Sequence, residues 1–127
     1  MSNYVLDSSA VLALLQQEPG KEKVEAILDD SVMSAVNYCE ILGKLIDAGV
    51  PDGEARESVD ILGVGVVGFD VDQARLAAAL SPATKSIGLS LGDRSCLALG
   101  LMRDHTVVTA DKAWGKLKIG LKIDVIR

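Results

Sequence analysis

The sequence is poor in aromatic side chains, histidine and cysteine, and it has no excess of positive charge. Aromatic residues make up 3% of the 127 residues, which argues against the base-stacking surfaces of RNP sheets and OB folds. The 18 acidic and 13 basic side chains give a net charge of -5, so we do not expect a protein that binds nucleic acids by neutralising phosphates. A protein this acidic would need bound metal ions to reverse the negative potential at any site that acts on a nucleic acid.

The scarcity of cysteine and histidine limits the other kinds of site. Cys39 and Cys96 are too few for a disulfide framework or a cysteine-based zinc site, and both lie in apolar helical patterns, so we expect buried thiols. A single histidine, His105, excludes His-rich metal sites and disfavours a His-based triad. Asp7 interrupts the first apolar stretch, and the apolar run 10–15 is too short to span a membrane. These features predict a soluble, cytoplasmic protein.

The composition that remains is that of a folded protein. Hydrophobic residues make up 49% and charged residues 24%, and the length predicts a single domain spanning 1–127. Short apolar runs predict strands at 4–6, 31–34, 64–69, 106–109 and 123–126, the last at an edge. Helical patterns cover 8–17, 21–30, 35–48, 51–62, 71–80, 91–104 and 112–117, and 83–90 is expected to be a loop. This alternation predicts an α/β fold around a central parallel sheet of about four or five strands.

Four acids from distant parts of the sequence fall where one edge of such a sheet would gather them. Asp7 and Asp111 follow predicted strands, and ligands of open α/β sheets bind at the carboxyl ends of the strands. Asp93 begins one predicted helix, and Glu40 lies in the first half of another. Clustered carboxylates repel one another unless a cation lies among them, and Mg²⁺ or Mn²⁺ suits such ligands. The pattern favours metal-assisted phosphodiester hydrolysis.

Each acid also has a purely structural interpretation. Asp7 and Asp111 can cap the helices that follow them, and Asp93 can form a capping box with Ser90. Glu40 can pair with the lysine four residues later, an interaction of only about 0.2–0.5 kcal/mol. Spacing alone leaves both interpretations open.

The segments that carry the four acids are distinctive when they are taken together. They are YVLDSSAVLALL (4–15), SAVNYCEI (34–41), LGDRSCLALG (91–100) and VVTADK (107–112). In content, order and spacing they resemble the PIN domain family, and most closely its VapC-type toxin ribonucleases. The resemblance runs from end to end of the chain. One departure is that Lys112 is followed by alanine and tryptophan, so no further acid is evident there.

The resemblance implies a PIN-like α/β/α sandwich that binds Mg²⁺ or Mn²⁺. The implied metal ligands and catalytic groups are Asp7, Glu40, Asp93 and Asp111, with hydroxyl support from Ser9 and Thr109. The candidate RNA contacts near these acids are Arg94, Lys112 and Lys85. The family further implies a homodimer, cleavage of structured RNA such as transfer or ribosomal RNA, and a VapB-like antitoxin. We expect the antitoxin tail to pack in a groove between the segments 18–30 and 51–62.

Proteins of other classes share part of this pattern. A receiver-like phosphoacceptor domain would use Asp7, Asp70 and Lys112, but it needs a second acid beside the first. A haloacid-dehalogenase-type phosphatase needs an Asp-x-Asp pair, whereas Asp7 is followed by two serines. The alternatives that stay open are a non-catalytic PIN-fold binding module, a housekeeping PIN nuclease and, with less support, the receiver-like domain.

Overall fold

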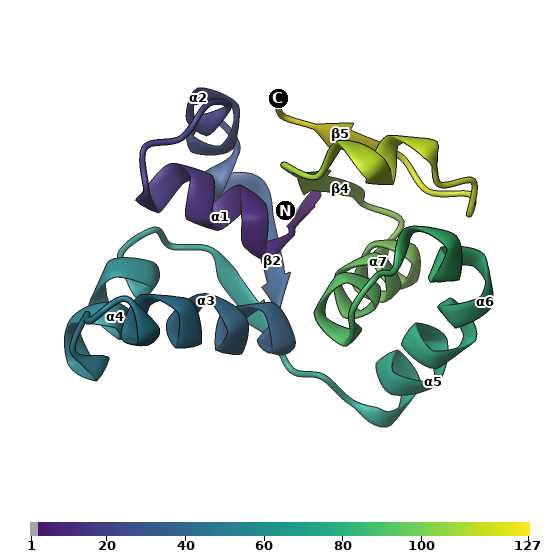
Figure 1. Cartoon of the computed structure of the whole chain (residues 1–127), viewed down its shortest axis with the longest axis horizontal. Helices are drawn as coiled ribbons and strands as arrows, with labels where there is room; N and C mark the ends of the chain where they lie inside the picture. The colour runs from purple at the N-terminus through teal and green to yellow at the C-terminus, as the bar shows by residue number, and fades with distance from the viewer. Residues whose placement is uncertain (1–2) are drawn as a thin grey trace.

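The computed structural model describes residues 3–127, which form a five-stranded parallel sheet with helices on both faces (Figure 1). The strand order is β3-β2-β1-β4-β5. The strands are β1 (Tyr4–Leu6), β2 (Ser31–Ser34), β3 (Gly65–Val67), β4 (Thr106–Thr109) and β5 (Ile123–Val125). The α-helices are α1 (Ser8–Leu15), α2 (Lys21–Glu25), α3 (Ala35–Asp47), α4 (Asp52–Asp60), α5 (Val71–Ala79), α6 (Ser81–Thr84) and α7 (Leu91–Arg103). Three short 3-10 helices are η1 (Leu28–Asp30), η2 (Lys85–Ile87) and η3 (Lys112–Lys116). The predicted α/β/α class is confirmed.

The inner strands are apolar on both faces because both faces are covered. Successive side chains of a strand point to opposite sides, and two separate cores result. Val5, Val32 and Val107 belong to the core that contains α7. Leu6, Met33 and Val108 belong to the core that contains α1. Figure 1 shows the corresponding layers, with α1 to α4 on one side of the sheet and α5 to α7 on the other.

The connections diverge at β1, which lies between β2 and β4. The chain runs from β1 through β2 to β3 with α1 to α4 on one face, and it returns through α5 to α7 on the other face to β4. In open parallel sheets, the carboxyl end of the strands at such a switch point is where ligands bind. Asp7 is the residue that follows β1 at this point.

Two predicted segments differ in the structure. The segment 21–30 is divided into α2 and η1, because Ile27, with a φ of −115°, leaves the helical range. The predicted loop 83–90 contains the end of α6 and all of η2. Pro82 lies in the first turn of α6, where the missing N–H needs no partner, so this proline starts a helix instead of only ending one. None of the helices within residues 3–127 combines the length and apolar character needed to cross a bilayer.

Candidate active site

Asp7 is a buried carboxylate at the carboxyl end of β1, and only 3% of its surface is exposed. Its Oδ2 accepts hydrogen bonds from Ser9 Oγ at 2.6 Å and from Thr109 Oγ1 at 3.0 Å. Its Oδ1 is buried and has no hydrogen-bond partner. Burial raises the pKa of Asp7 to about 6, the Asp93 carboxylate adds to the increase, and the two hydroxyls oppose it. One oxygen is therefore fixed and the other is unpartnered.

Ser9 and Thr109 connect the ends of β1 and β4 around this carboxylate. Their hydroxyl oxygens are 3.2 Å apart. Ser9 Oγ accepts a hydrogen bond from the Ala110 N–H at 2.9 Å, and Thr109 Oγ1 accepts one from the Asp111 N–H at 3.1 Å. Because backbone donors occupy the hydroxyl lone pairs, the hydroxyl hydrogens can be directed to Asp7. Both residues predicted to support the site thus contact Asp7.

Glu40 is held from α1 and from its own helix, α3. Its Oε1 accepts hydrogen bonds from Ser8 Oγ at 2.7 Å and from Asn37 Nδ2 at 3.0 Å. The fully buried Asn37 also donates to the Gly92 carbonyl at 3.1 Å, which ties α3 to α7. A Cβ at Gly92 would collide with the Glu40 carboxyl group, so the glycine leaves the space that Glu40 occupies.

Sequence reasoning missed the three residues that surround Glu40, namely Ser8, Asn37 and Gly92. Asn37 precedes Glu40 by three residues, a spacing that places two side chains on one helix face. That spacing was a signal that could have identified Asn37. No local pattern marks Gly92, because its importance comes from the approach of α7 to α3.

Asp93 and Asp111 make the helix-capping contacts that the sequence analysis gave as the alternative to metal binding. Asp93 Oδ2 accepts a hydrogen bond from the Ser90 N–H at 2.9 Å, and Ser90 Oγ accepts one from the Asp93 N–H at 3.2 Å. Asp111 is exposed, and its Oδ1 accepts a hydrogen bond from the Ala113 N–H at 3.0 Å. A carboxylate accepts at two oxygens, so each cap leaves one oxygen for another role.

Three of the four predicted acids lie near the buried Cys96 thiol. Burial raises the pKa of the Cys96 thiol well above its usual range, and the charges of Asp7, Asp93 and Glu40 add to the increase. Asp111 adjoins this group through its N–H bond to Thr109. In the part of the chain that the structure describes, however, no three acidic, histidine or cysteine side chains come close enough to hold a metal ion together. The caps at Asp93 and Asp111 direct these two carboxyl groups to their own helices.

The unpartnered Oδ1 of Asp7 is the feature that fits a divalent cation. A buried carboxylate oxygen without a donor is costly, and a hard cation or its bound water would satisfy it. Mg²⁺ commonly uses one or two protein carboxylates and keeps several waters. The residues present therefore suit Mg²⁺ without three acids in mutual contact.

The three candidate RNA contacts have different surroundings. Arg94 Nη1 donates to the Ala77 carbonyl at 3.0 Å, which holds its guanidinium between α7 and α5. Lys85 lies in η2 and Lys112 begins η3, and both are exposed. Arg94 thus joins two helices, whereas the two lysines lie on the surface.

Comparison with known proteins places this geometry in a family. Curated proteins give no match to the chain. The solved structures that are similar include DNA-bound VapBC from Salmonella typhimurium, with 14% identity, 100% of both chains covered and a TM-score of 0.77. A toxin–antitoxin complex from Klebsiella pneumoniae has 15% identity, 98% of both chains covered and a TM-score of 0.77. VapBC-5 from Mycobacterium tuberculosis has 21% identity, 98% of both chains covered and a TM-score of 0.68. At these identities the likeness shows the fold. The family model for the PIN domain matches residues 4–119, and the chain therefore belongs to the PIN domain family.

Proposed function

We propose that this PIN domain protein is a divalent-metal-dependent endoribonuclease and the toxin of a VapBC-type toxin–antitoxin pair. The observation that carries the proposal is the buried Asp7 carboxylate at the carboxyl end of the central strand, which has one unpartnered oxygen and whose pKa is raised by burial and by the charge of Asp93. Structured RNA, such as transfer or ribosomal RNA, is the proposed substrate, and a homodimer in the cytoplasm is the proposed form. The similar structures of VapBC complexes support the toxin assignment.

Mg²⁺ or Mn²⁺ would bind at Asp7, and Glu40, Asp93 and Asp111 would reach the ion through its bound water molecules, because no three of these side chains lie together among the described residues. The ion, when bound, would lower the pKa of a water molecule and stabilise the charge on the leaving oxygen. Without a cation, the carboxylates and the net charge of -5 oppose the approach of a phosphate.

The protein's own side chains orient two of these acids before substrate binds. Ser9 and Thr109 fix Oδ2 of Asp7, and this leaves Oδ1 available. Ser8 and Asn37 fix Oε1 of Glu40 in the same way. Groups that are already oriented need no reorganisation during the reaction.

The test is RNA cleavage by Asp7→Asn and Asp93→Asn with Mg²⁺ or Mn²⁺, using transfer and ribosomal RNA. Both variants should be folded by circular dichroism and nearly inactive, because each has lost a charge that would hold the ion. The matched control is Asp70→Asn, which changes an exposed N-cap carboxylate of α5 and should leave cleavage unchanged. If both site variants cleave RNA as well as wild type in highly purified protein, Asp7 and Asp93 are not the catalytic residues.

A small antitoxin with a tail that folds on binding is the proposed partner. The segments expected to receive it enclose a pocket of about 380 Å³ between α1, η1 and α4, lined by Leu14, Leu28, Ile61 and Leu62 among others. Ile61 is 84% exposed, so a tail that packs here would bury apolar surface. An arginine from the tail would pair with the carboxylates and compete with the metal.

Co-expression with the neighbouring small reading frame tests this partner. Growth arrest by the chain alone, relief by the partner, and no arrest with Asp93→Asn are the expected results. A chain that is harmless when overexpressed and copurifies with no small protein would contradict the toxin assignment.

A non-catalytic PIN module is the second candidate, and one observation favours it. Asp7, Asp93 and Asp111 all make helix-capping contacts, which account for their presence without catalysis. If this candidate is correct, wild-type protein cleaves no RNA with Mn²⁺, and replacing these residues with alanine costs about 0.5–2 kcal/mol of stability each.

A further inference from the structure

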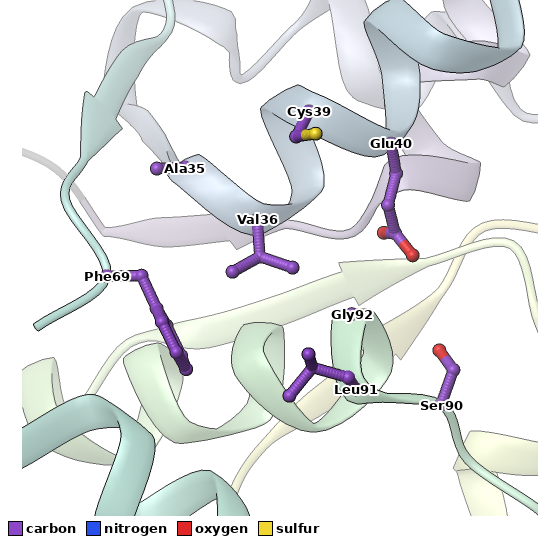
Figure 2. Close-up of a pocket in the computed structure, with 8 residues that line it drawn as sticks. All are labelled: Ala35, Val36, Cys39, Glu40, Phe69, Ser90, Leu91 and Gly92. Carbon is purple, nitrogen blue, oxygen red and sulfur yellow. The ribbon is translucent and has the colours of Figure 1, made fainter. Parts of the chain in front are cut away.

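A pocket of about 510 Å³ lies beside Glu40, where α3 and α7 begin (Figure 2). Val36, Phe69 and Leu91 are the larger apolar side chains among its lining residues. Figure 2 shows Phe69 at one end of the pocket and the Glu40 carboxylate at the other. A concave, mostly apolar site with a few polar groups is typical of a small-ligand pocket.

Phe69 is the aromatic side chain among the lining residues of this pocket, and it also packs against the core that contains α7. The other aromatic residues are engaged elsewhere. Trp114 is fully buried, Tyr38 donates its hydroxyl to Asp60 at 2.8 Å, and Tyr4 packs against the core that contains α1. A flat group in the pocket would therefore meet one aromatic ring, that of Phe69, in a pocket that Glu40 also lines.

We propose that this pocket binds one nucleobase of the RNA substrate, from a nucleotide next to the phosphate that is cleaved. The proposal rests on the proposed nuclease function. Proteins that recognise single-stranded RNA commonly stack unpaired bases on aromatic side chains. Glu40, one of the proposed metal ligands, and Gly92, which directly precedes Asp93, both line the pocket, so a base in the pocket would hold its own backbone near these carboxylates.

Ser90 adds a polar group at the rim of the pocket. Its hydroxyl oxygen accepts a hydrogen bond from the Asp93 N–H at 3.2 Å, which leaves its hydrogen to donate to a ring nitrogen or a carbonyl of the base. A single aromatic ring and a single hydroxyl suit one base rather than an extended stacking surface.

The two cysteines provide a direct test. Cys39 lines the pocket and is exposed, contrary to the predicted buried thiol, whereas Cys96 is fully buried as predicted. N-ethylmaleimide should therefore modify Cys39 and spare Cys96 in the folded protein. AMP or CMP should protect Cys39 from modification in buffer with Mg²⁺, which offsets the repulsion of the phosphate, as followed by mass spectrometry. Ribose 5-phosphate should not protect it, because it lacks the base.

Two variants and one matched control locate the binding. Phe69→Ala should raise the AMP concentration that gives half-maximal protection by about tenfold, because the stacking surface is lost. Leu91→Glu should do the same by placing a charge in the apolar wall. Val71→Glu is the control for Leu91→Glu. Both sites begin a helix and are exposed, at 64% for Val71 and 53% for Leu91, but Val71 lies outside the pocket lining, so Val71→Glu should bind AMP like wild type.

Several results would overturn the proposal. They are equal protection by ribose 5-phosphate, no protection by any nucleotide, and equal protection of wild type and Leu91→Glu. Protection of Cys39 that increases with protein concentration and needs no nucleotide would assign the pocket to a second copy of the chain instead.

The outcomes also separate this proposal from the nuclease function. Base-dependent protection in a protein that cleaves no RNA would support the pocket and contradict the nuclease. Cleavage by Phe69→Ala and Leu91→Glu with the wild-type preference for flanking bases would overturn the pocket and leave the nuclease in place.

Discussion

Replacing Asp7 with asparagine should stabilise the fold by an amount that depends on pH. Burial raises the pKa of Asp7 from 3.8 to about 6, so the folded state binds this proton more tightly than the unfolded state. The contribution of Asp7 to the free energy of unfolding is therefore most favourable below pH 3.8, decreases as the pH rises to about 6, and is constant above that range. At about 1.4 kcal/mol for each pH unit, the full cost of ionising Asp7 is roughly 3 kcal/mol.

Asparagine removes the charge but keeps the other functions of the side chain. Its carbonyl oxygen can accept the hydrogen bonds from Ser9 and Thr109, and asparagine is a good N-cap for α1. Its NH₂ group would take the place of Oδ1, which has no hydrogen-bond partner in the structure. The unsatisfied amide hydrogens would lower the free energy of unfolding by about 1–3 kcal/mol. We therefore expect Asp7→Asn to exceed wild type by up to about 2 kcal/mol at pH 8. At pH 4 we expect the variant to be equal to wild type or less stable.

Urea denaturation in EDTA between pH 4 and pH 8, followed by circular dichroism, measures this difference. Asp70→Asn is the control, because Asp70 is an exposed N-cap whose Oδ1 accepts from the Gln73 N–H at 2.9 Å. Its effect should stay within about 0.5 kcal/mol at every pH. A loss of stability in Asp7→Asn that is the same at pH 4 and pH 8 would refute the reasoning, since Asp7 would then act only as a helix cap.

Three further outcomes test the site and its partner. Gly92→Ala should lower the kcat for RNA cleavage by more than tenfold with an unchanged circular dichroism spectrum, because the new Cβ displaces the Glu40 carboxyl group. Gly43→Ala, which meets open space, is the control, and equal activity of the two variants would contradict this effect. Millimolar Mn²⁺ should raise the melting temperature of wild type by several degrees, since an ion at 100 times its Kd adds about 2.7 kcal/mol; thermal scanning that gives the same increase for Asp7→Asn would argue against Asp7 as a ligand. Ile61→Asp should weaken antitoxin binding in calorimetry by about tenfold or more and spare RNA cleavage, because Ile61 lines the proposed groove; unchanged affinity would place the tail elsewhere.

The sequence by itself determined the class of fold and the order of its elements. The runs at 4–6, 31–34 and 106–109 each contain two adjacent apolar residues, which point to opposite faces of a strand, as expected for strands covered on both sides. Boundaries were less certain where helices are short. The segments 21–30 and 83–90 have weak patterns, and packing decided how they divide into turns.

The sequence also placed Asp7 and Asp111 directly after two neighbouring parallel strands, β1 and β4, because strand ends can be counted along the chain. Their catalytic and metal-binding roles stay predictions. The capping contacts of Asp93 and Asp111 could also be predicted from the sequence, because a helix cap involves only residues that are close together in the chain.

Only the tertiary structure decided how the surroundings of these acids are built. The pKa of Asp7 depends on its burial at the ends of β1 and β4. The position of the Glu40 carboxylate depends on its hydrogen bond from Asn37 and on the space that Gly92 leaves. Cys39 lies outside the core and Phe69 lines a pocket because of where α3 and α7 meet. Periodicity reports which face of an element is apolar, but it does not report which residues of two distant elements will touch. That depends on how the layers pack.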